Sequence, residues 1–223
     1  MNDFSVRAML QQLPYFAQVN EAVLSELAQQ AVRCTFTANE MIFLEGESSA
    51  GLWILQNGRV KAYKLSPDGQ EYVMNFFAPG STFNDLAALD GAKNPVSTMA
   101  VTDVIAWTIP SAVFVSALQN DHEMCRAVLQ GLVGRVRHLV GRVEDLALRP
   151  VTARLARFLL QQVENPTLDD PAITRALIAQ HLATTPESIS RSLRLLEEAG
   201  AIRFDRHHII VISPSVLEQQ ARL

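Results

Sequence analysis

The sequence predicts an α+β chain in which a β-rich first half is followed by one long helix and a small helical part that ends in a β-hairpin. Three observations support this prediction. Short runs rich in β-branched and aromatic residues recur between residues 31 and 110, with turn residues between them. Apolar residues between 121 and 147 alternate at spacings of three and four. Residues 173–211 contain two short helical patterns and then two short β-prone runs.

Length and composition predict a soluble protein with one or two compact domains. The 223 residues are 48% hydrophobic, which is ample for real cores. No apolar run approaches the roughly 18 residues that a membrane span needs, and the N-terminus lacks the basic start and apolar run of a secretory signal. Cys34 and Cys125 are the only cysteines, which fits a reducing compartment. We therefore expect a cytoplasmic protein with no membrane partner.

A short helical region precedes the β-rich part. Pro14 is expected to interrupt it early, and its apolar positions are Leu13, Phe16, Val23, Leu24 and Leu27. From residue 31 the pattern changes to strands, with the runs RCTFT, EMIFLEG, LWILQNG, RVKAYKL, EYVMNFF and VIAWTI. Turn signals separate them at residues 45–46, 57–58, 67–69 and 79–80. Many short strands with regular turns predict a sandwich or a barrel-like β-roll.

A long helix is predicted over residues 121–147, with apolar positions that suit a coiled coil. The seam consists of Leu129, Leu132, Val136, Leu139, Val143 and Leu146. This spacing predicts a homodimer through the helix, and the alternative is a helix that packs on its own β-roll. Gly131, Gly134 and Gly141 each cost about 1 kcal/mol of helix propensity relative to Ala, so they either permit close packing or leave the helix pliable. Arg149-Pro150 predicts a hinge, because the residue before proline disfavours helix.

Two helices joined by a tight turn are predicted between residues 173 and 200. Thr174 is the expected N-cap of the first, whose apolar face comprises Ile173, Leu177, Ile178 and Leu182. Ala183 and Thr184 form the break. Thr185 can cap the second helix, Pro186 suits its first position, and Gly200 ends it. Its apolar face is formed by Ile189, Leu193 and Leu196, and its polar face by Glu187, Ser190, Arg191 and Arg194.

The polar face of the second helix carries side chains that can read DNA bases. Arginine matches the O6/N7 edge of guanine, a carboxylate accepts from the N4 amino group of cytosine, and serine is adaptable. A helix-turn-helix is the frame that suits this arrangement, and residues 202–211 predict a hairpin wing beside it. The alternative is a small helical hairpin whose polar face is only solvated.

These motifs resemble the Crp/Fnr superfamily of bacterial transcription regulators. PESISR at residues 186–191 is similar to the family's recognition helix, and Glu187, Ser190 and Arg191 match the E-x-x-S-R pattern of the Fnr-type subgroup, which reads TTGAT-like half-sites. LWILQNGRVKAYK, the PDG turn and FAPGSTF resemble its jelly-roll, cyclic-nucleotide-binding-like sensor domain. The resemblance implies a β-roll sensor domain at residues 1–120, a dimerisation helix at 121–148 and a winged helix-turn-helix DNA-binding domain at 149–223.

The resemblance also implies partners: a second copy of the chain, double-stranded DNA and RNA polymerase. The expected DNA contacts are Thr185, Glu187, Ser188, Ser190, Arg191, Arg194 and Arg206, with Arg194 and Arg206 at phosphates. An effector or redox signal would alter the packing of the roll on the long helix and rotate the recognition helices into successive major grooves. The alternative function is a non-DNA regulatory β-roll module whose C-terminal helices bind a protein partner.

The net charge of −4 argues at first sight against a nucleic-acid partner. The charge is uneven, however. Residues 1–148 hold 10 basic and 15 acidic side chains, whereas residues 149–223 hold 9 basic and 8 acidic ones. The placement of charge, and not its total, must therefore supply any affinity for DNA.

The residue inventory argues against an enzyme. All five histidines follow residue 120, so the β-roll lacks the imidazoles that a cupin-type metal enzyme needs. The sequence also has no nucleophile elbow, P-loop or dinucleotide fingerprint. His207 and His208 are expected at a solvated wing tip and not in a metal site, and His181 in a structural or phosphate-facing role. We expect no catalytic residues and no metal site.

The effector is expected to bind near residues 83–101. In cyclic-nucleotide binders of this family, a G-E-L stretch holds the ribose and an R-S pair holds the phosphate. This sequence has Asn84-Asp85-Leu86 at the first position, and no arginine in the segment. A buried phosphate without a bidentate arginine would be poorly neutralised, so cyclic AMP is disfavoured. The expected pocket residues are Phe83, Asn84, Asp85, Leu86 and Lys93, the last being the only nearby cation.

Two metal cofactors can also be judged from the sequence. An iron–sulfur cluster is disfavoured, because four cysteines are its usual ligands and the chain has two. The segment TFNDLAALDGAKNP resembles the Dnr-type branch of the family, which is associated with nitric oxide sensing through haem. Haem is therefore a possible cofactor, with His138 on the long helix as a candidate ligand. The alternative is that His138 is a surface or interface residue.

Overall fold

The computed structural model describes residues 3–164, 174–205 and 208–222. The chain forms two compact units, of which the first comprises residues 1–64 and 75–137 and the second residues 65–74 and 138–223. This partition differs from the three-part division predicted by the sequence, because residues 65–74 group with the second unit and the long helix is divided after residue 137. The three functional domains remain a prediction.

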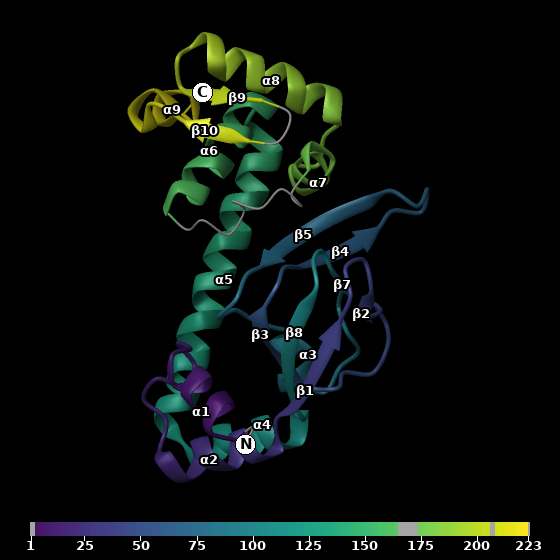
Figure 1. The fold of residues 1–223 in the computed structure, drawn as a ribbon, viewed down its shortest axis with the longest axis vertical. Coiled ribbons are helices and arrows are strands. Elements are labelled where there is room, and N and C mark those ends of the chain that lie inside the picture. Colours follow the sequence, from purple (N-terminus) through teal and green to yellow (C-terminus); the bar gives the residue numbers. More distant parts are fainter. Residues whose placement is uncertain (1–2, 165–173, 206–207, 223) are drawn as a thin grey trace. The chain divides into compact units, whose positions relative to one another are not determined.

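A β-roll of two four-stranded sheets dominates the first unit, although the tip of its β4–β5 hairpin groups with the second (Figure 1). The sheets have the strand orders β1-β8-β3-β6 and β2-β7-β4-β5. The strands are β1 (Val32–Phe36), β2 (Met41–Phe43), β3 (Leu52–Asn57), β4 (Val60–Leu65), β5 (Glu71–Phe77), β6 (Thr82–Phe83), β7 (Ser97–Ala100) and β8 (Val104–Ile109). The six runs predicted as strands are confirmed. Strands β6 and β7 were not predicted.

Glycine is required at two tight points of the roll. Gly58 follows β3 with φ +87°, and a Cβ added there would lie 2.2 Å from the carbonyl oxygen of Asp103. Gly51 precedes β3 with φ +140°, and its added Cβ would lie 1.9 Å from the carbonyl oxygen of Ile109. Because L side chains rarely adopt such φ values, both positions need glycine for their backbone conformation and for space.

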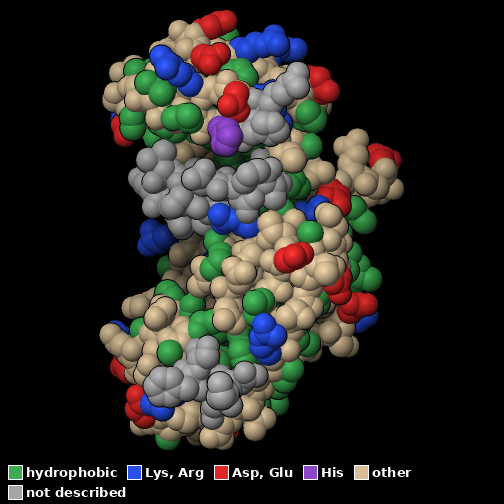
Figure 2. All heavy atoms as spheres, viewed as in Figure 1, with side chains coloured by type: hydrophobic (Ala, Val, Ile, Leu, Met, Phe, Trp, Pro, Cys, Tyr) green, Lys and Arg blue, Asp and Glu red, His purple; other side chains and the backbone are tan. Residues whose placement is uncertain are grey.

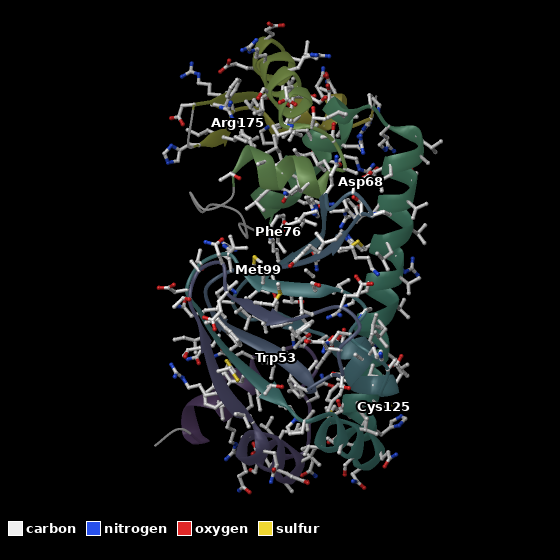
Figure 3. The ribbon with its side chains drawn as sticks, turned by 90° about the vertical axis from the view of Figure 1, so that its right-hand side faces the viewer. Trp53, Asp68, Phe76, Met99, Cys125 and Arg175 are labelled. Carbon is white, nitrogen blue, oxygen red and sulfur yellow. The ribbon has the colours of Figure 1, made fainter. Side chains whose placement is uncertain are left out.

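Two apolar clusters hold the first unit together. One lies inside the roll and contains Trp53, which is labelled in Figure 3. The Trp53 ring stacks on that of Phe83, with ring centroids 5.9 Å apart. The other joins α1 (Asp3–Gln11), α2 (Glu21–Gln30), α4 (Ser111–Asn120) and the start of α5 (His122–Leu148) at one end of the roll. Its most buried side chains include Leu10, Leu27, Phe114 and Met124.

The long helix α5 confirms the prediction for residues 121–147, and it ends directly before Arg149-Pro150. Gly131 lets α5 approach Tyr15 of the same chain closely, since a Cβ at this position would lie 2.5 Å from the Tyr15 ring. Leu132 is half-buried and packs on the cluster that α5 shares with α1, α2 and α4. The other seam positions, and two valines that were not predicted, are between 44 and 67% exposed: Leu129, Val133, Val136, Leu139, Val140, Val143 and Leu146. None of the described helices is both long and apolar enough to cross a membrane.

The described residues of the second unit after residue 137 form the end of α5, four further helices and a two-stranded hairpin. They are α6 (Val151–Glu164), α7 (Arg175–His181), α8 (Pro186–Glu198), β9 (Ile202–Phe204), β10 (Ile209–Val211) and α9 (Pro214–Gln220). Strands β9 and β10 pair antiparallel, which confirms the predicted hairpin after α8. One apolar cluster includes Leu155 of α6, Ile178 of α7, Leu193 of α8 and Leu217 of α9. This shared core fixes α8 on α6 and α7.

Candidate nucleic-acid interface and effector site

The start of α8 is built as the sequence predicts. Thr185 is extended and its Oγ1 accepts from the backbone N–H of Ser188 at 3.3 Å, while Pro186 occupies the first turn. The hydroxyl of Ser190 donates to the carbonyl oxygen of Pro186 at 2.9 Å. Thr185 and Ser190 are therefore each bonded within the first turn, which holds their oxygens in place on the polar face.

The two faces of α8 separate cleanly. Ile189, Leu193 and Leu196 are fully buried, whereas Glu187, Arg191 and Arg194 are exposed. The pKa of Glu187 is lowered because its carboxylate accepts a hydrogen bond from the Glu187 backbone N–H and a second one from the Thr185 hydroxyl. The carboxylate therefore stays ionised as a hydrogen-bond acceptor near the positive end of the helix. Ser192, which was not singled out in the sequence, is buried, and its hydroxyl lies 3.0 Å from that of Thr152.

The turn between α7 and α8 contains a residue with a strained backbone conformation. The Thr174 hydroxyl caps α7, as predicted, by accepting from the N–H of Leu177. Ala183 follows α7 with φ +50°, a left-handed conformation that is uncommon outside glycine, asparagine and aspartate. The N–H of Thr184 then bonds to the carbonyl of Ala179 at 3.0 Å, which closes the turn.

The wing adds basic groups that sequence reasoning missed. Arg203 on β9 is exposed. Arg175 at the start of α7 donates to the carbonyl of Asp205 at 2.6 Å and lies over the Phe204 ring at 5.2 Å, so it fastens the wing to α7. Figure 2 shows basic and acidic side chains mixed over the C-terminal elements, in line with their nearly balanced charge. Arg206, predicted at a phosphate, and Ile173 lie outside the described residues.

The five predicted effector residues divide into a buried and an exposed group. Phe83 belongs to the aromatic cluster of the roll, and Asn84 donates to the side-chain oxygen of Asn94 at 2.9 Å. Asp85, which begins helix α3 (Asp85–Asp90), is buried as well. Leu86 and Lys93 are exposed, so the fold does not bring them together with the other three.

Asp85 is held by two side chains that the sequence did not indicate. Arg135 of α5 forms an ion pair with one of its oxygens, and the Tyr15 hydroxyl donates to the other at 2.9 Å. Arg135 also donates to the carbonyl of Thr82 at 3.2 Å. Burial, and then the adjacent Asp85 carboxylate, raise the pKa of Tyr15 to about 12. Lys93 is thus not the only nearby cation, because the fold brings Arg135 to the effector segment.

The surroundings of His138 do not fit a haem. His138 is exposed on α5, and desolvation followed by the charge of Arg142 lowers its pKa. The cavity that it lines has a volume of about 40 Å³ and is bordered by arginines. Ligand pockets usually have several hundred Å³ and mostly apolar walls. Within the described part of the chain, no group of three or more His, Cys, Asp or Glu side chains is placed to hold a metal ion.

Comparison with known proteins gives matches in both units. Residues 33–121 match the family of cyclic nucleotide-binding domains, and residues 153–220 match the Crp-like helix-turn-helix domain. A CRP-like cAMP-activated global transcriptional regulator of Mycobacterium tuberculosis is 25% identical over 214 residues, which are 93% of this chain and 96% of that protein.

Solved structures share the fold over most of the chain. A transcriptional regulator of the CRP family from Thermus thermophilus is 26% identical, with a TM-score of 0.66 over 85% of this chain and 97% of that one. FixK2 from Bradyrhizobium japonicum, at 23% identity, has a TM-score of 0.77 over 85% and 96% of the two chains. The relatives from Mycobacterium tuberculosis and Thermus thermophilus are both named as transcriptional regulators.

Proposed function

Because this chain belongs to the Crp/Fnr superfamily of DNA-binding transcription regulators, we propose that it binds a TTGAT-like palindrome as a homodimer and responds to an effector other than cyclic AMP. The observation that carries the proposal is the exposed polar face of α8. Glu187 and Arg191 lie one helical turn apart on that face, beside Ser190. A helix that only packs on the domain has no need of this triplet.

In the proposed complex, α8 lies in the major groove and its first two turns read bases. The guanidinium of Arg191 binds O6 and N7 of guanine, and the Glu187 carboxylate accepts from the N4 amino group of cytosine. Thr185, Ser188 and Ser190 line the edge of the same surface. Arg194 and the wing arginine Arg203, both exposed, contact phosphates and position the helix.

The proposed dimer uses the exposed apolar stripe of α5. Val136, Val140 and Val143 are each at least 60% exposed, which is costly for a helix that stays alone in water. Their spacing of four and three places them on one face with Leu129, Leu139 and Leu146. Two copies joined there would present two recognition helices to a palindrome. Leu132, which packs on its own chain, contributes less than the sequence predicted.

The proposed effector is a ligand other than cyclic AMP. The predicted phosphate-binding segment has no arginine, and Lys93 is exposed. Arg135, which reaches the segment from α5, has its charge balanced by Asp85. A phosphodiester buried there would have to compete with this ion pair. Because Arg135 belongs to α5, a ligand that displaces it would act directly on the proposed dimerisation helix.

As a DNA-binding regulator, the protein is expected in the cytoplasm, where it would work with RNA polymerase. A gel-shift titration with a TTGAT-N4-ATCAA duplex and a scrambled duplex of the same composition tests the proposal. We expect the cognate duplex to bind roughly a thousandfold or more tightly. Equal affinity for both duplexes would contradict sequence-specific recognition and favour a helical domain that binds a protein partner.

A further inference from the structure

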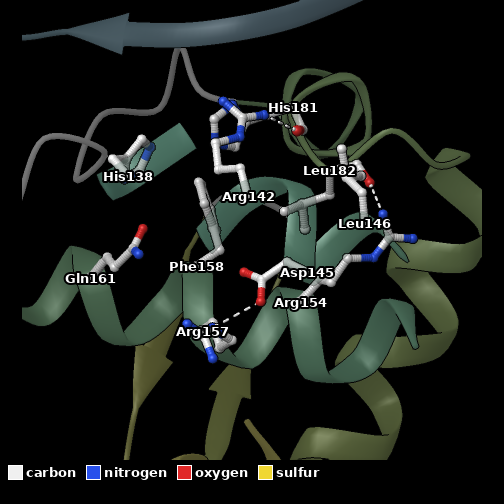
Figure 4. A pocket seen from close by; sticks show the side chains of 10 residues that line it. All are labelled: His138, Arg142, Asp145, Leu146, Arg154, Arg157, Phe158, Gln161, His181 and Leu182. Carbon is white, nitrogen blue, oxygen red and sulfur yellow. Dashed lines mark hydrogen bonds and ion pairs between the residues drawn. The ribbon is translucent and has the colours of Figure 1, made fainter. Parts of the chain in front are cut away.

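A small cavity in the second unit has an unusual excess of positive charge. Its volume is about 40 Å³, and it lies among α5, α6 and α7 (Figure 4). The titratable side chains that line it are His138, Arg142, Asp145, Arg154, Arg157 and His181. Three arginines and one carboxylate thus line the cavity.

The single carboxylate does not balance these arginines. Asp145 already pairs with Arg149, at 3.0 Å, in addition to Arg157, at 3.2 Å. Arg142 donates to the Tyr72 hydroxyl and to the carbonyls of Met74 and His181, and these three acceptors are all neutral. The cavity therefore has at least two guanidinium charges without an anionic partner among the described residues.

Arg154 adds a second, independent observation. Its Nη1 donates to the carbonyl oxygen of Leu182 at 2.7 Å. Its Nε is buried, and no acceptor for it is found among the described residues. A buried donor of a charged group is costly to leave unbonded, so an acceptor supplied from outside the chain would stabilise it.

The histidines respond to the same positive field. Desolvation, and then the charge of Arg142, lower the pKa of His181 to about 3 and also lower that of His138. Both rings are therefore neutral near pH 7 and can donate one N–H each. The Nδ1 of His181 is already 3.1 Å from the carbonyl oxygen of Val73.

We propose that this cavity binds the phosphate group of a small anionic ligand, with Arg154, whose Nε lacks an acceptor among the described residues, as its principal donor and Arg157, which shares Asp145 with Arg149, beside it. A volume of about 40 Å³ holds a few waters or one tetrahedral oxyanion. Guanidinium groups match phosphate oxygens with parallel charge-assisted hydrogen bonds. The phosphate can belong to free inorganic phosphate or to a nucleotide whose remaining atoms lie outside the cavity. This site is separate from the base-reading face of α8 and from the effector segment of the roll.

The test is calorimetry of the full-length protein with inorganic phosphate, at constant ionic strength in chloride buffer at pH 7. Wild type is expected to bind saturably, with one site per chain. Arg157→Gln and Arg154→Gln should each weaken binding about tenfold or more, since each removes one charged pair of donors. Arg137→Gln, an exposed arginine of α5 outside the cavity, should leave it unchanged.

A second arm identifies the source of the phosphate. If adenosine 5′-monophosphate competes with inorganic phosphate and has the lower dissociation constant, the ligand is a nucleotide. If it does not compete, the ligand is the free oxyanion. The absence of saturable binding at millimolar phosphate would overturn the proposal. Undiminished binding in both Arg157→Gln and Arg154→Gln would also overturn it, because the anion would then bind elsewhere. Circular dichroism checks that each variant is folded.

Discussion

Arg135 of α5 forms an ion pair with Asp85, the first residue of α3, inside the first unit. The two residues are 50 positions apart in the sequence. In the resemblance to cyclic-nucleotide binders, Asp85 stands where the G-E-L stretch of those proteins has its glutamate. The second oxygen of Asp85 accepts from Tyr15. Both oxygens of the carboxylate thus already accept from side chains of the chain itself.

This engagement predicts that cyclic AMP does not bind. A ribose hydroxyl would have to displace Tyr15 or Arg135 from Asp85, and no arginine of residues 83–101 is available for the phosphate. Calorimetry with cyclic AMP should therefore give no binding in the millimolar range or tighter. An isotherm with a micromolar dissociation constant would contradict this part of the account.

The buried neutral state of His181 predicts a pH-dependent stability. Its pKa is lowered to about 3 in the folded chain, so between pH 6.5 and pH 3 the unfolded chain binds the proton and the folded chain does not. The contribution of the neutral His181 ring to the free energy of unfolding is therefore complete above about pH 6.5, and it is lost as the pH falls. From pH 6.5 to pH 5 the free energy of unfolding should drop by about 1.5 kcal/mol, because the slope approaches about 1.4 kcal/mol per pH unit once the unfolded histidine is protonated.

Urea denaturation of wild type and His181→Gln at both pH values measures this loss. The variant should show a smaller decrease, because glutamine does not titrate. His122→Gln, at the exposed start of α5, serves as the control and should follow wild type. An equal decrease in His181→Gln would assign the pH dependence to other groups.

The left-handed conformation of Ala183 predicts a stabilising substitution. Glycine adopts φ +50° without the steric cost that alanine bears, so Ala183→Gly should raise the free energy of unfolding by about 0.5–1 kcal/mol. Ala176→Gly, at an exposed position in the first turn of α7 where the residue is helical, is the control and should lower it. Thermal denaturation separates the two cases by the sign of the change in Tm.

The exposed stripe on α5 predicts that charge at Val136 prevents dimerisation. In a dimer through this face, Val136→Glu would place like charges close together and bury an unpaired carboxylate. Sedimentation at micromolar concentration should show wild type as a dimer and the variant as a monomer. Gln130→Glu, exposed and outside the stripe, should remain dimeric. A monomeric wild type would contradict the proposed interface.

The parts of the fold that were predictable depend on local pattern. The helices α5, α7 and α8 follow from apolar spacing, and their ends follow from Thr174, Thr185 and Pro150. Strands β6 and β7 have two and four residues, and they form because β3, β2 and β4 lie beside them, so no local pattern indicates them. The same limit applies to α3, which begins from Asn84 in a left-handed conformation.

The two candidate sites also differ in how far a local sequence pattern predicts them. The exposed polar face of α8, which we propose reads bases, was predictable because one helix carries Glu187, Ser190 and Arg191 at fixed spacing. The effector segment was only partly predictable. Tyr15 and Arg135 reach Asp85 from 70 and 50 positions away, and no periodicity in the sequence connects those positions. The aromatic residues near Phe83 likewise come from four different strands.

The measurement that tests the central claim most directly is the specificity of Arg191→Ala. Gel shifts at fixed salt give its affinity for the TTGAT-N4-ATCAA duplex and for duplexes with the half-site guanine replaced. The account predicts a loss of about 1–3 kcal/mol per half-site on the cognate duplex and little loss on the replaced ones. Arg203→Ala, at a proposed phosphate contact, should instead weaken binding to all duplexes alike. Equal losses for Arg191→Ala on every duplex would contradict base recognition by α8.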